Sequence, residues 1–289
     1  MMKIDSVKRA NQIRKIIVYS TLIVLSIGFL FPLFWMLSTA LKDYAQNLSY
    51  PPSLLPNPLT FSNFRYALFD FIPYFKYFFN SVLITGIGVI ATVFSSSLVA
   101  FGFARFRVNS RSNKILFGIV IATLMLPTQI TMISSYVIWS KLGFLSGFKA
   151  YVPLLVGAFF GGSPFFIFLI RQFFLGIPKE LEEAARLDGC SSFRIYWQIF
   201  LPLSKPILAT VAIFSFQAYW NDYMGPLIYV KDVDRYTLAQ ALTLFELPHE
   251  VLWGPMMAAS LVTLIPIVIL FFTFQKYFIA SINVSGIKG

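Results

Sequence analysis

The chain has 289 residues, of which 57% are hydrophobic and 12% charged, and its mean hydropathy of +0.74 excludes an ordinary water-soluble domain. Several apolar runs are long enough to cross about 30 Å of hydrocarbon, so the sequence predicts an all-α polytopic membrane protein. The net charge of +11 does not indicate nucleic-acid binding, because no cluster of Lys and Arg lies on a soluble domain.

No motif for self-contained catalysis is present in the sequence. The phosphate-binding pattern G-x-x-x-x-G-K-[ST] and the G-x-S-x-G elbow are absent, and His249 is the only histidine. Cys190 is the only cysteine, so the chain can form neither an internal disulfide nor a Cys-based metal site. We therefore predict no catalytic residue, no metal and no cofactor, and we expect any energy for transport to come from another chain.

The N-terminal tail, residues 1–15, is basic, and an apolar run at about 16–37 follows it. This run is too long for the apolar part of a signal peptide and lacks a small-x-small cleavage site, so we predict an uncleaved first span with a cytoplasmic N-terminus. A proline-rich external segment follows, from about Ser38 to Lys76. The remaining spans are expected at about 77–103, 115–139, 151–170, 206–230 and 253–278, within a transmembrane domain of residues 16–279 that precedes a cytoplasmic tail of residues 280–289.

The basic residues support six membrane-spanning helices with both termini in the cytoplasm. Of the 23 Lys and Arg residues, sixteen fall on the expected cytoplasmic side and seven on the outside, as the positive-inside rule requires. Prolines interrupt five of the spans, at Pro32, Pro127, Pro164, Pro226 and Pro266. Neighbouring helices could satisfy the carbonyls that these prolines free, or the kinks could shape a pathway and permit rocking, and the sequence leaves both interpretations open.

The one long polar segment between apolar runs, residues 178–205, lies between the fourth and fifth spans. Pro178, the glutamates that follow it and Gly189 predict a first helix and its stop. Ser191 or Ser192 can cap a second helix. That helix has an apolar face that we expect to lie along the bilayer boundary, while the first helix stays exposed to a partner; the face consists of Phe193, Tyr196, Trp197, Phe200 and Leu201.

A polar and aromatic group interrupts the fifth span: Gln217, Trp220, Asn221 and Asp222. At 1.5 Å per residue, Gln217 would lie about 17 Å from Pro206, near the midplane. A carboxylate in hydrocarbon is costly, so Asp222 should face the helix bundle, a water-filled cavity or a partner. Amides, a carboxylate and an aromatic ring suit sugar binding, and we treat the four residues as candidates for a substrate path. The alternative is that Asp222 reaches the interface and Asn221 bonds a neighbouring helix.

The polar segment also resembles a known family. Glu183-Ala184-Ala185, Gly189, Ile199, Leu201 and Pro202 match the EAA loop of permease subunits of bacterial ATP-binding-cassette (ABC) importers. The resemblance implies that the segment is a cytoplasmic coupling helix that seats in a groove on a separate ATPase subunit. It assigns this contact to Glu182, Glu183, Ala184, Ala185, Asp188 and Gly189. Cys190 departs from the family pattern, in which small residues such as Ala are usual.

The resemblance extends over nearly the whole chain. The six spans, Trp220-Asn221-Asp222, Pro226, Tyr236-Thr237-Leu238 and the closing residues 286–289 are similar to the second permease of maltose-type sugar importers. This implies a multi-pass permease of the bacterial cell membrane, in contact with membrane lipid, that moves a sugar or oligosaccharide inward by alternating access. The implied partners are a second permease subunit in a heterodimer, two cytoplasmic ATP-binding-cassette subunits and an extracellular or periplasmic solute-binding protein.

Two alternatives remain at this stage. A permease for a non-sugar solute would have the same loop. A self-contained secondary transporter or channel is less well supported, because it would need paired intramembrane charges and usually an internal repeat, and the sequence has neither. The resemblance implies that the main sugar contacts lie mostly on the partner permease. The segment from Lys231 to Leu252 mixes charged and apolar residues and is a candidate docking surface for the solute-binding protein.

Overall fold

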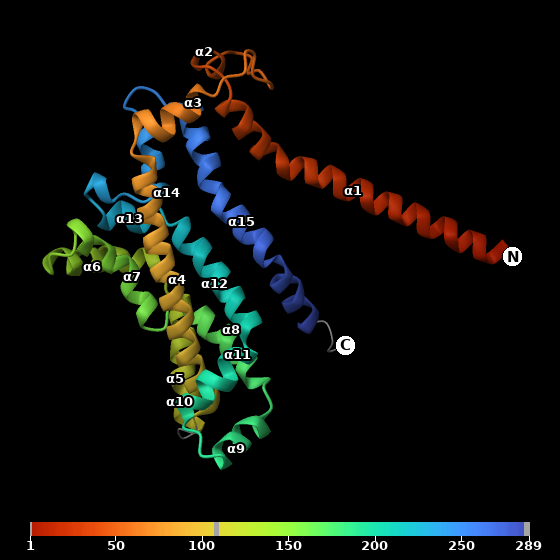
Figure 1. Ribbon diagram of the computed structural model, residues 1–289, viewed down its shortest axis with the longest axis vertical. Coiled ribbons are helices and arrows are strands. Elements are labelled where there is room, and N and C mark those ends of the chain that lie inside the picture. Colours follow the sequence, from red (N-terminus) through yellow and green to blue (C-terminus); the bar gives the residue numbers. More distant parts are fainter. Residues whose placement is uncertain (1, 107–109, 286–289) are drawn as a thin grey trace. The chain divides into compact units, whose positions relative to one another are not determined.

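The computed structural model describes residues 2–106 and 110–285, and these are mostly helical (Figure 1). The expected helical class is confirmed. The chain divides into two compact units: the first holds the residues up to Pro73 together with Leu244–Thr263, and the second holds Tyr74–Thr243 and the residues from Leu264 on. The resemblance noted for residues 286–289 lies outside the described residues.

The first unit begins with a long apolar helix. Its elements are α1 (Met2–Ala40), α2 (Tyr44–Asn47), α3 (Ser62–Arg65), the π-helical turn η1 (Tyr66–Phe71) and the first turns of α15 (Trp253–Ser285). Large apolar side chains of α1, such as Ile16 and Phe29, are exposed, and Pro32 lies inside the helix without ending it. This apolar surface is available to lipid or to a partner subunit.

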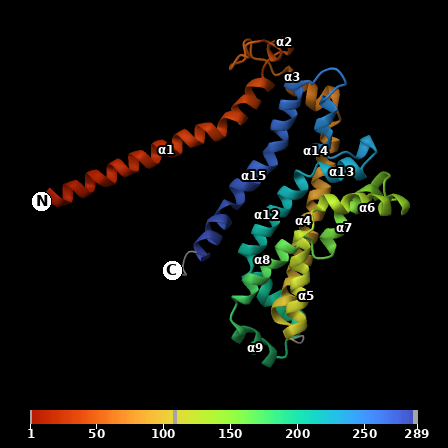
Figure 2. The same cartoon turned by 180° about the vertical axis from the view of Figure 1, so that it is seen from behind.

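The second unit is a bundle centred on α4. Its elements are α4 (Tyr74–Arg105), α5 (Ser110–Ala122), η2 (Thr123–Met125), α6 (Thr128–Lys141), η3 (Gly147–Tyr151), α7 (Val152–Phe159), α8 (Pro164–Leu175), α9 (Lys179–Leu187), α10 (Ser192–Ile195), η4 (Tyr196–Phe200), α11 (Leu201–Leu203), α12 (Lys205–Trp220), α13 (Met224–Tyr229), η5 (Val233–Arg235), α14 (Leu238–Ala241) and η6 (Leu242–Phe245), whose last residues belong to the first unit. Helices α4, α8 and α12 lie side by side in both views (Figures 1 and 2). The rings of Phe101 in α4, Phe174 in α8 and Phe200 in η4 pack edge to face, and Val211 of α12 belongs to the same buried cluster. Burial of this cluster supplies apolar contact between the three helices and η4.

Among the described residues, four helices are long and apolar enough to cross a membrane: Asn11–Ala40, Tyr74–Arg105, Gly147–Leu175 and Trp253–Gln275. Two further pairs pass the same test as bent spans, with 96° between Arg111–Met125 and Gln129–Lys141 and 80° between Ser192–Leu203 and Lys205–Trp220. The chain is therefore a polytopic helical protein with four to six candidate spans.

Three of the expected continuous spans are broken, for local reasons. The third bends at Pro127, the residue before α6, which has no N–H to continue the preceding helix. The fourth is split into α7 and α8 by Gly161 and Gly162, which have positive φ. The fifth ends at Trp220 rather than near Val230, because the side chain of Asp222 accepts the Gly225 N–H at 3.0 Å and turns the chain before Pro226.

Candidate functional site: the α9 corner and the cavities of each unit

The polar segment folds as two short helices joined by a corner at Gly189. Gly189 has φ +78°, and the N–H groups of Gly189 and Cys190 donate to the carbonyls of Arg186 and Ala185 at 3.0 and 2.9 Å. This is the Schellman pattern, which needs a left-handed residue after the helix. Ser191, one of the two serines expected to do so, caps the second helix by accepting the Arg194 N–H. The predicted helix, glycine corner and cap are confirmed.

Helix α9 has one face on the bundle and one face exposed. Ala185 is buried against the core, and the side chain of Glu182 is only 12% exposed. The other residues that the resemblance assigns to the ATPase contact, Glu183, Ala184, Asp188 and Gly189, are exposed. Leu187, which the sequence reasoning did not include, is 90% exposed and adds an apolar side chain to the outer face. The first helix is therefore exposed over only part of its surface.

Arg105, the last residue of α4, connects three elements at this end of the bundle. Its guanidinium donates to the carbonyls of Phe174 and Ile177 at 2.6 Å each, lies 3.7 Å from a carboxylate oxygen of Glu182, and sits 4.9 Å from the ring centre of Phe200. Its side chain is only 4% exposed. A buried cation is tolerated only with such partners, so Arg105 ties α9 to α4 and to the end of α8.

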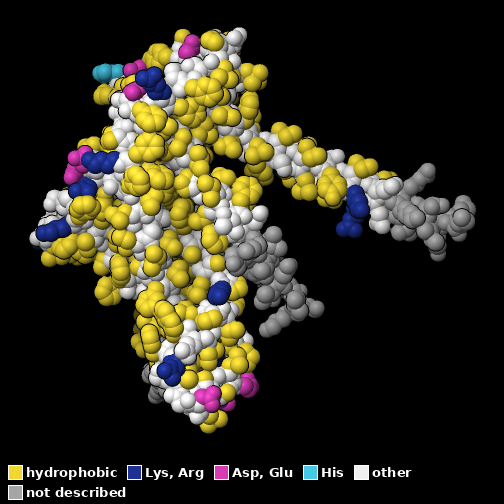
Figure 3. Space-filling model, in the orientation of Figure 1, with side chains coloured by type: hydrophobic (Ala, Val, Ile, Leu, Met, Phe, Trp, Pro, Cys, Tyr) yellow, Lys and Arg dark blue, Asp and Glu magenta, His cyan; other side chains and the backbone are white. Residues whose placement is uncertain are grey.

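A polar cavity of about 640 Å³ opens between α9 and the end of α4. Lys179, Glu182, Glu183 and Arg186 line it, and Arg186 donates to Glu182 at 2.9 Å. Acidic and basic side chains gather at this end of the second unit, next to a largely hydrophobic surface (Figure 3). The mixture of exposed charge and apolar side chains is suited to contact with another protein chain.

The second helix does not place its whole apolar face on one boundary. Tyr196 and Phe200 are buried in the core of the bundle, where the Tyr196 hydroxyl lies 2.7 Å from that of Ser97, while Phe193 and Trp197 are exposed. The π-helical turn η4 shifts the register of this face. The segment is thus packed into the bundle on one side and open to lipid on the other.

The four candidates for a substrate path do not form one surface. Trp220 is buried and packs against Phe78 and Phe216. Gln217 is exposed, and Asn221 is exposed at the position that ends α12, where its N–H donates to the Gln217 carbonyl. Asp222 is half-buried and bonded to Gly225. The structure therefore leaves the two amides open to a ligand and uses Trp220 and Asp222 in packing and turning the chain.

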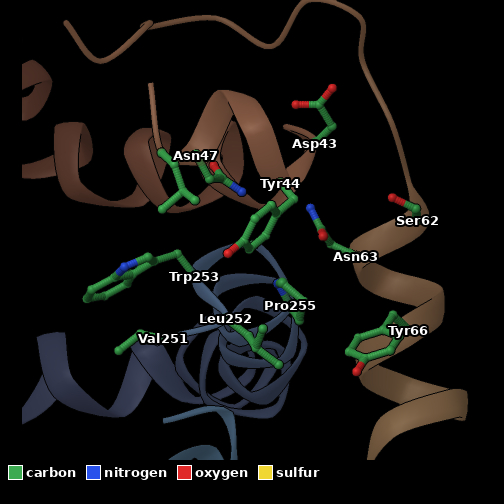
Figure 4. Close-up of a pocket in the computed structure, with 12 residues that line it drawn as sticks. Asp43, Tyr44, Asn47, Ser62, Asn63, Tyr66, Val251, Leu252, Trp253 and Pro255 are labelled. Atoms are coloured by element: carbon green, nitrogen blue, oxygen red, sulfur yellow. The ribbon is translucent and has the colours of Figure 1, made fainter. Parts of the chain in front are cut away.

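In the first unit, a pocket of about 320 Å³ lies at the N-terminus of α15 (Figure 4). Asn47, Asn63 and Trp253 surround it, and a Cβ on Gly254 would lie within 2.6 to 2.8 Å of the two amides. The Tyr44 hydroxyl donates to Glu250 at 2.6 Å, and this bond raises the pKa of Tyr44. The pocket is lined by residues that follow α1 and by residues at the start of α15.

The segment from Lys231 onward has an ion pair in the second unit. Lys76 donates to Asp234 at 2.6 Å, and this hydrogen bond lowers the pKa of Asp234 below its ordinary value. The side chain of Asn80 donates to the carbonyl of Tyr236 at 3.0 Å. These contacts fix the start of the segment that the sequence offers as a docking surface.

Sequence reasoning missed Arg105 and Tyr219. Arg105 was counted only among the basic residues that set topology, because a positive charge at the end of a span is ordinary there. Tyr219 stands next to the polar group of the fifth span, and its ring lies over Gly88 of α4. A glycine inside a long apolar run signals close approach of another group, and this signal could have drawn attention to the pair.

The described fold, mostly helical with four to six candidate spans, is that of a polytopic membrane protein. Residues 93–284 match the model of a family described as "Binding-protein-dependent transport system inner membrane component", and the chain belongs to this family.

Two relatives and one structure give the particulars. The chain is 33% identical over 276 residues to the arabinooligosaccharides transport system permease protein AraQ of Halalkalibacterium halodurans, covering 92% of this chain and 96% of that protein. It is 32% identical over 269 residues to the diacetylchitobiose uptake system permease protein DasC of Streptomyces coelicolor, covering 93% and 95%. A crystal structure of a bacterial ABC transporter that imports the acidic polysaccharide alginate has a chain of the same fold, with a TM-score of 0.79 at 24% identity over 93% of this chain and 98% of that one.

Proposed function

We propose that this chain is one permease subunit of a binding-protein-dependent ABC importer that moves an oligosaccharide into a bacterial cell. The observation that carries the proposal is the family match over residues 93–284, together with relatives of nearly equal length whose names specify oligosaccharide transport. The partners are a second permease, two cytoplasmic ATP-binding-cassette subunits and a solute-binding protein. ATP hydrolysis takes place on the ATPase subunits.

The test is disruption of the gene in its native host. Uptake of at least one labelled sugar from a panel of maltotriose, arabinotriose, diacetylchitobiose and a trimer of mannuronate should be lost, and a plasmid copy of the gene should restore it. A tagged copy should purify with a second permease and an ATPase. Unchanged uptake of the whole panel would argue against an oligosaccharide importer.

Six spans with both termini in the cytoplasm form part of the proposal. Counting each bent pair as one span raises the candidate spans from four to six, and the sixteen-to-seven division of basic residues supports this orientation. A reporter that is active only in the cytoplasm should work when fused after Gly189 and should fail when fused after Pro52 or Asp232. Cytoplasmic activity at either of the last two positions would overturn the six-span arrangement.

The exposed face of α9 is proposed as the contact with the ATPase. Glu183, Ala184, Asp188 and Gly189 face outward, whereas Glu182 and Ala185 hold the helix to its own chain. The charge reversal Glu183→Lys should uncouple ATP hydrolysis from uptake while the protein still reaches the membrane. Arg194→Glu, on the second helix, is a control for a charge reversal outside α9. Wild-type uptake by Glu183→Lys would remove α9 from the contact.

The segment from Lys231 to Leu252 is proposed as the docking surface for the solute-binding protein. Its charged side chains include Asp232, Arg235 and Glu246. Arg235 is half-buried and Glu246 is exposed. A cysteine at Thr243 or Glu246 should cross-link to the sugar-loaded binding protein. Failure to cross-link in every nucleotide state would contradict this assignment.

A further inference from the structure

A cavity of about 430 Å³ lies in the second unit where the fourth candidate span is broken. It is lined by residues of α4, η2, α12 and the break between α7 and α8. The break consists of Gly161 and Gly162, with φ +98° and +60°, followed by Ser163, which caps α8. This volume falls within the range of small-ligand sites, about 300 to 1,000 Å³.

The cavity lies near the middle of α4. Thr92, on its wall, is roughly 27 Å from Tyr74 and roughly 20 Å from Arg105 at 1.5 Å per residue. If α4 crosses the bilayer, the broken backbone beside Thr92 is at the depth of the hydrocarbon. Non-helical backbone is tolerated there only when it is buried in protein or lines a water-filled cavity. Secondary transporters form their substrate sites at broken helices of this depth, which shows that such a break can hold a ligand.

The break is held in place by hydroxyl groups of α4. Ser96 donates to the Gly161 carbonyl at 2.8 Å, and Ser95 donates to the carbonyl of Ala158. A Cβ on Gly162 would lie 2.8 Å from the Thr92 methyl group, so the break sits directly against α4. The cavity wall is therefore preorganised rather than a loose loop.

Two further features give the cavity its chemistry. The half-buried ring of Tyr219 lies against Gly88, where a Cβ would come within 2.6 Å of it, and its hydroxyl is 3.4 Å from that of Thr92. Ser163 accepts the Phe165 N–H and keeps its own hydrogen to donate. None of the described residues that line the cavity is charged. The wall thus offers hydroxyl groups and an aromatic ring to an uncharged ligand.

We propose that this cavity is a contact site for one ring of a neutral oligosaccharide on its way across the membrane. The Tyr219 ring packs against the C–H face of the sugar, and the hydroxyls of Tyr219, Thr92 and Ser163 bond to the sugar hydroxyls. The inference rests on the proposed function and adds to it the residues that touch substrate and the class of sugar, uncharged rather than acidic. It shifts the contact on α12 from the earlier candidates to Tyr219.

The experiment uses the disruption strain complemented with variants of the full chain. Tyr219→Phe and Ser163→Ala each remove one hydroxyl and keep the packing, and each should lower uptake of the transported neutral sugar about five-fold, the size expected for one lost hydrogen bond. Tyr219→Phe should also change the ratio of uptake between maltotriose and arabinotriose. Tyr223→Phe, an exposed tyrosine four residues later that does not line the cavity, should leave uptake unchanged.

A second readout tests contact directly. With Cys190→Ser as the background, a cysteine at position 219 should react with a small charged methanethiosulfonate reagent in the purified complex, and excess of the transported neutral sugar should slow the reaction. Quantities of each variant complex are compared by size-exclusion chromatography, so that loss of assembly is not mistaken for loss of uptake.

The outcomes separate this inference from the proposed function. If the intact host takes up none of the panel through this chain, the proposed function fails and the inference with it. If uptake is present but Tyr219→Phe and Ser163→Ala match the wild type in rate and selectivity, only the inference fails. It also fails if the imported sugar is the mannuronate trimer alone, or if Tyr219→Ala blocks assembly with the second permease while the two hydroxyl deletions are silent. The last result would mean that a partner helix fills the cavity.

Discussion

Two glycine corners in the second unit differ in what surrounds them. Gly189 ends α9 at an exposed corner, and a Cβ built on it meets no atom within 4 Å. Gly162 lies between α7 and α8, where a Cβ would come within 2.8 Å of Thr92 and 3.0 Å of Ser96. Both residues have positive φ, so both need glycine for the backbone. Of the two, only Gly162 also has no room for a side chain, because Thr92 and Ser96 occupy that space.

The comparison shows how each corner is joined to the bundle. The break at Gly162 packs directly on α4 and is held by hydroxyl groups. The α9 corner is joined through the Arg105 guanidinium and Glu182, so a charged side chain does there what close packing does at the break. A charged contact on the inner face can hold such a corner and leave its outer face free for another protein.

Removal of Arg105 should have the largest effect. Arg105→Gln removes the buried one of the two cations beside Glu182, which keeps Arg186, and it leaves the carbonyls of Phe174 and Ile177 without their charged donor. The loss should cost about 3 kcal/mol, as for other buried charged groups that lose a partner. The measurement is the unfolding midpoint of the purified complex. If the corner is held only by this group, uptake per ATP hydrolysed should fall as well.

Arg105→Lys is the matched control, because it keeps the charge but replaces the planar fork, which reaches the two carbonyls through one nitrogen and Glu182 through the other, with a single nitrogen. The unfolding midpoint of Arg105→Lys should lie between those of the wild type and Arg105→Gln. Equal stability of all three proteins would mean that α9 is held by the packing of Ala185 and not by the charge, which would remove the contrast between the corners.

Gly162→Ala should have the next largest effect. The strained backbone and the overlap with Thr92 each add about 1 kcal/mol, so the loss of stability should be about 2 kcal/mol. Gly157→Ala, in the helix just before the break and with open space around it, is the matched control and should be nearly neutral. If Gly162→Ala leaves the unfolding midpoint of the complex unchanged, the break is not packed tightly against α4.

The sequence predicted the polar corner better than the apolar break. Glutamates, Gly189 and a serine cap are local signals, and each acts within a few residues of where it stands. The break at Gly161 and Gly162 carries a local turn signal of its own, Gly161-Gly162 followed by Ser163-Pro164, but it lies between long apolar runs that read as one span. What the sequence does not show is that Ser95 and Ser96, from a distant part of the chain, hold the break in place. In the same way, α12 was expected to continue past Trp220, since the turn formed by Asp222 and Gly225 is not visible in a hydrophobicity pattern.

Ser96→Ala should have a smaller effect than the glycine change. It leaves the Gly161 carbonyl without its donor, at a cost of about 1.5 kcal/mol, and the backbone conformation is unchanged. Ser97→Ala is the control, because the Ser97 hydroxyl bonds to Tyr196 and not to the break. Slower uptake with Ser96→Ala, at unchanged ATP hydrolysis, would connect the break to passage of substrate. If Ser96→Ala costs as much as Gly162→Ala, hydroxyl groups rather than packing hold the break.

Gly189→Ala should have the smallest effect on the isolated chain and the most informative one in the complex. Within the chain, only the backbone strain counts, about 1 kcal/mol, and Gly189→Asn should lose less because Asn tolerates this conformation. If the ATPase seats against this corner, any side chain at position 189 meets the partner. Both variants should then reduce the amount of ATPase that purifies with the chain, and Gly189→Asn should do so at least as much as Gly189→Ala although its backbone is less strained. The measurement is the ratio of ATPase to permease in the purified complex for both variants. An unchanged ratio for both would place the corner away from the ATPase, and the openness around Gly189 would then be the condition of an ordinary exposed turn.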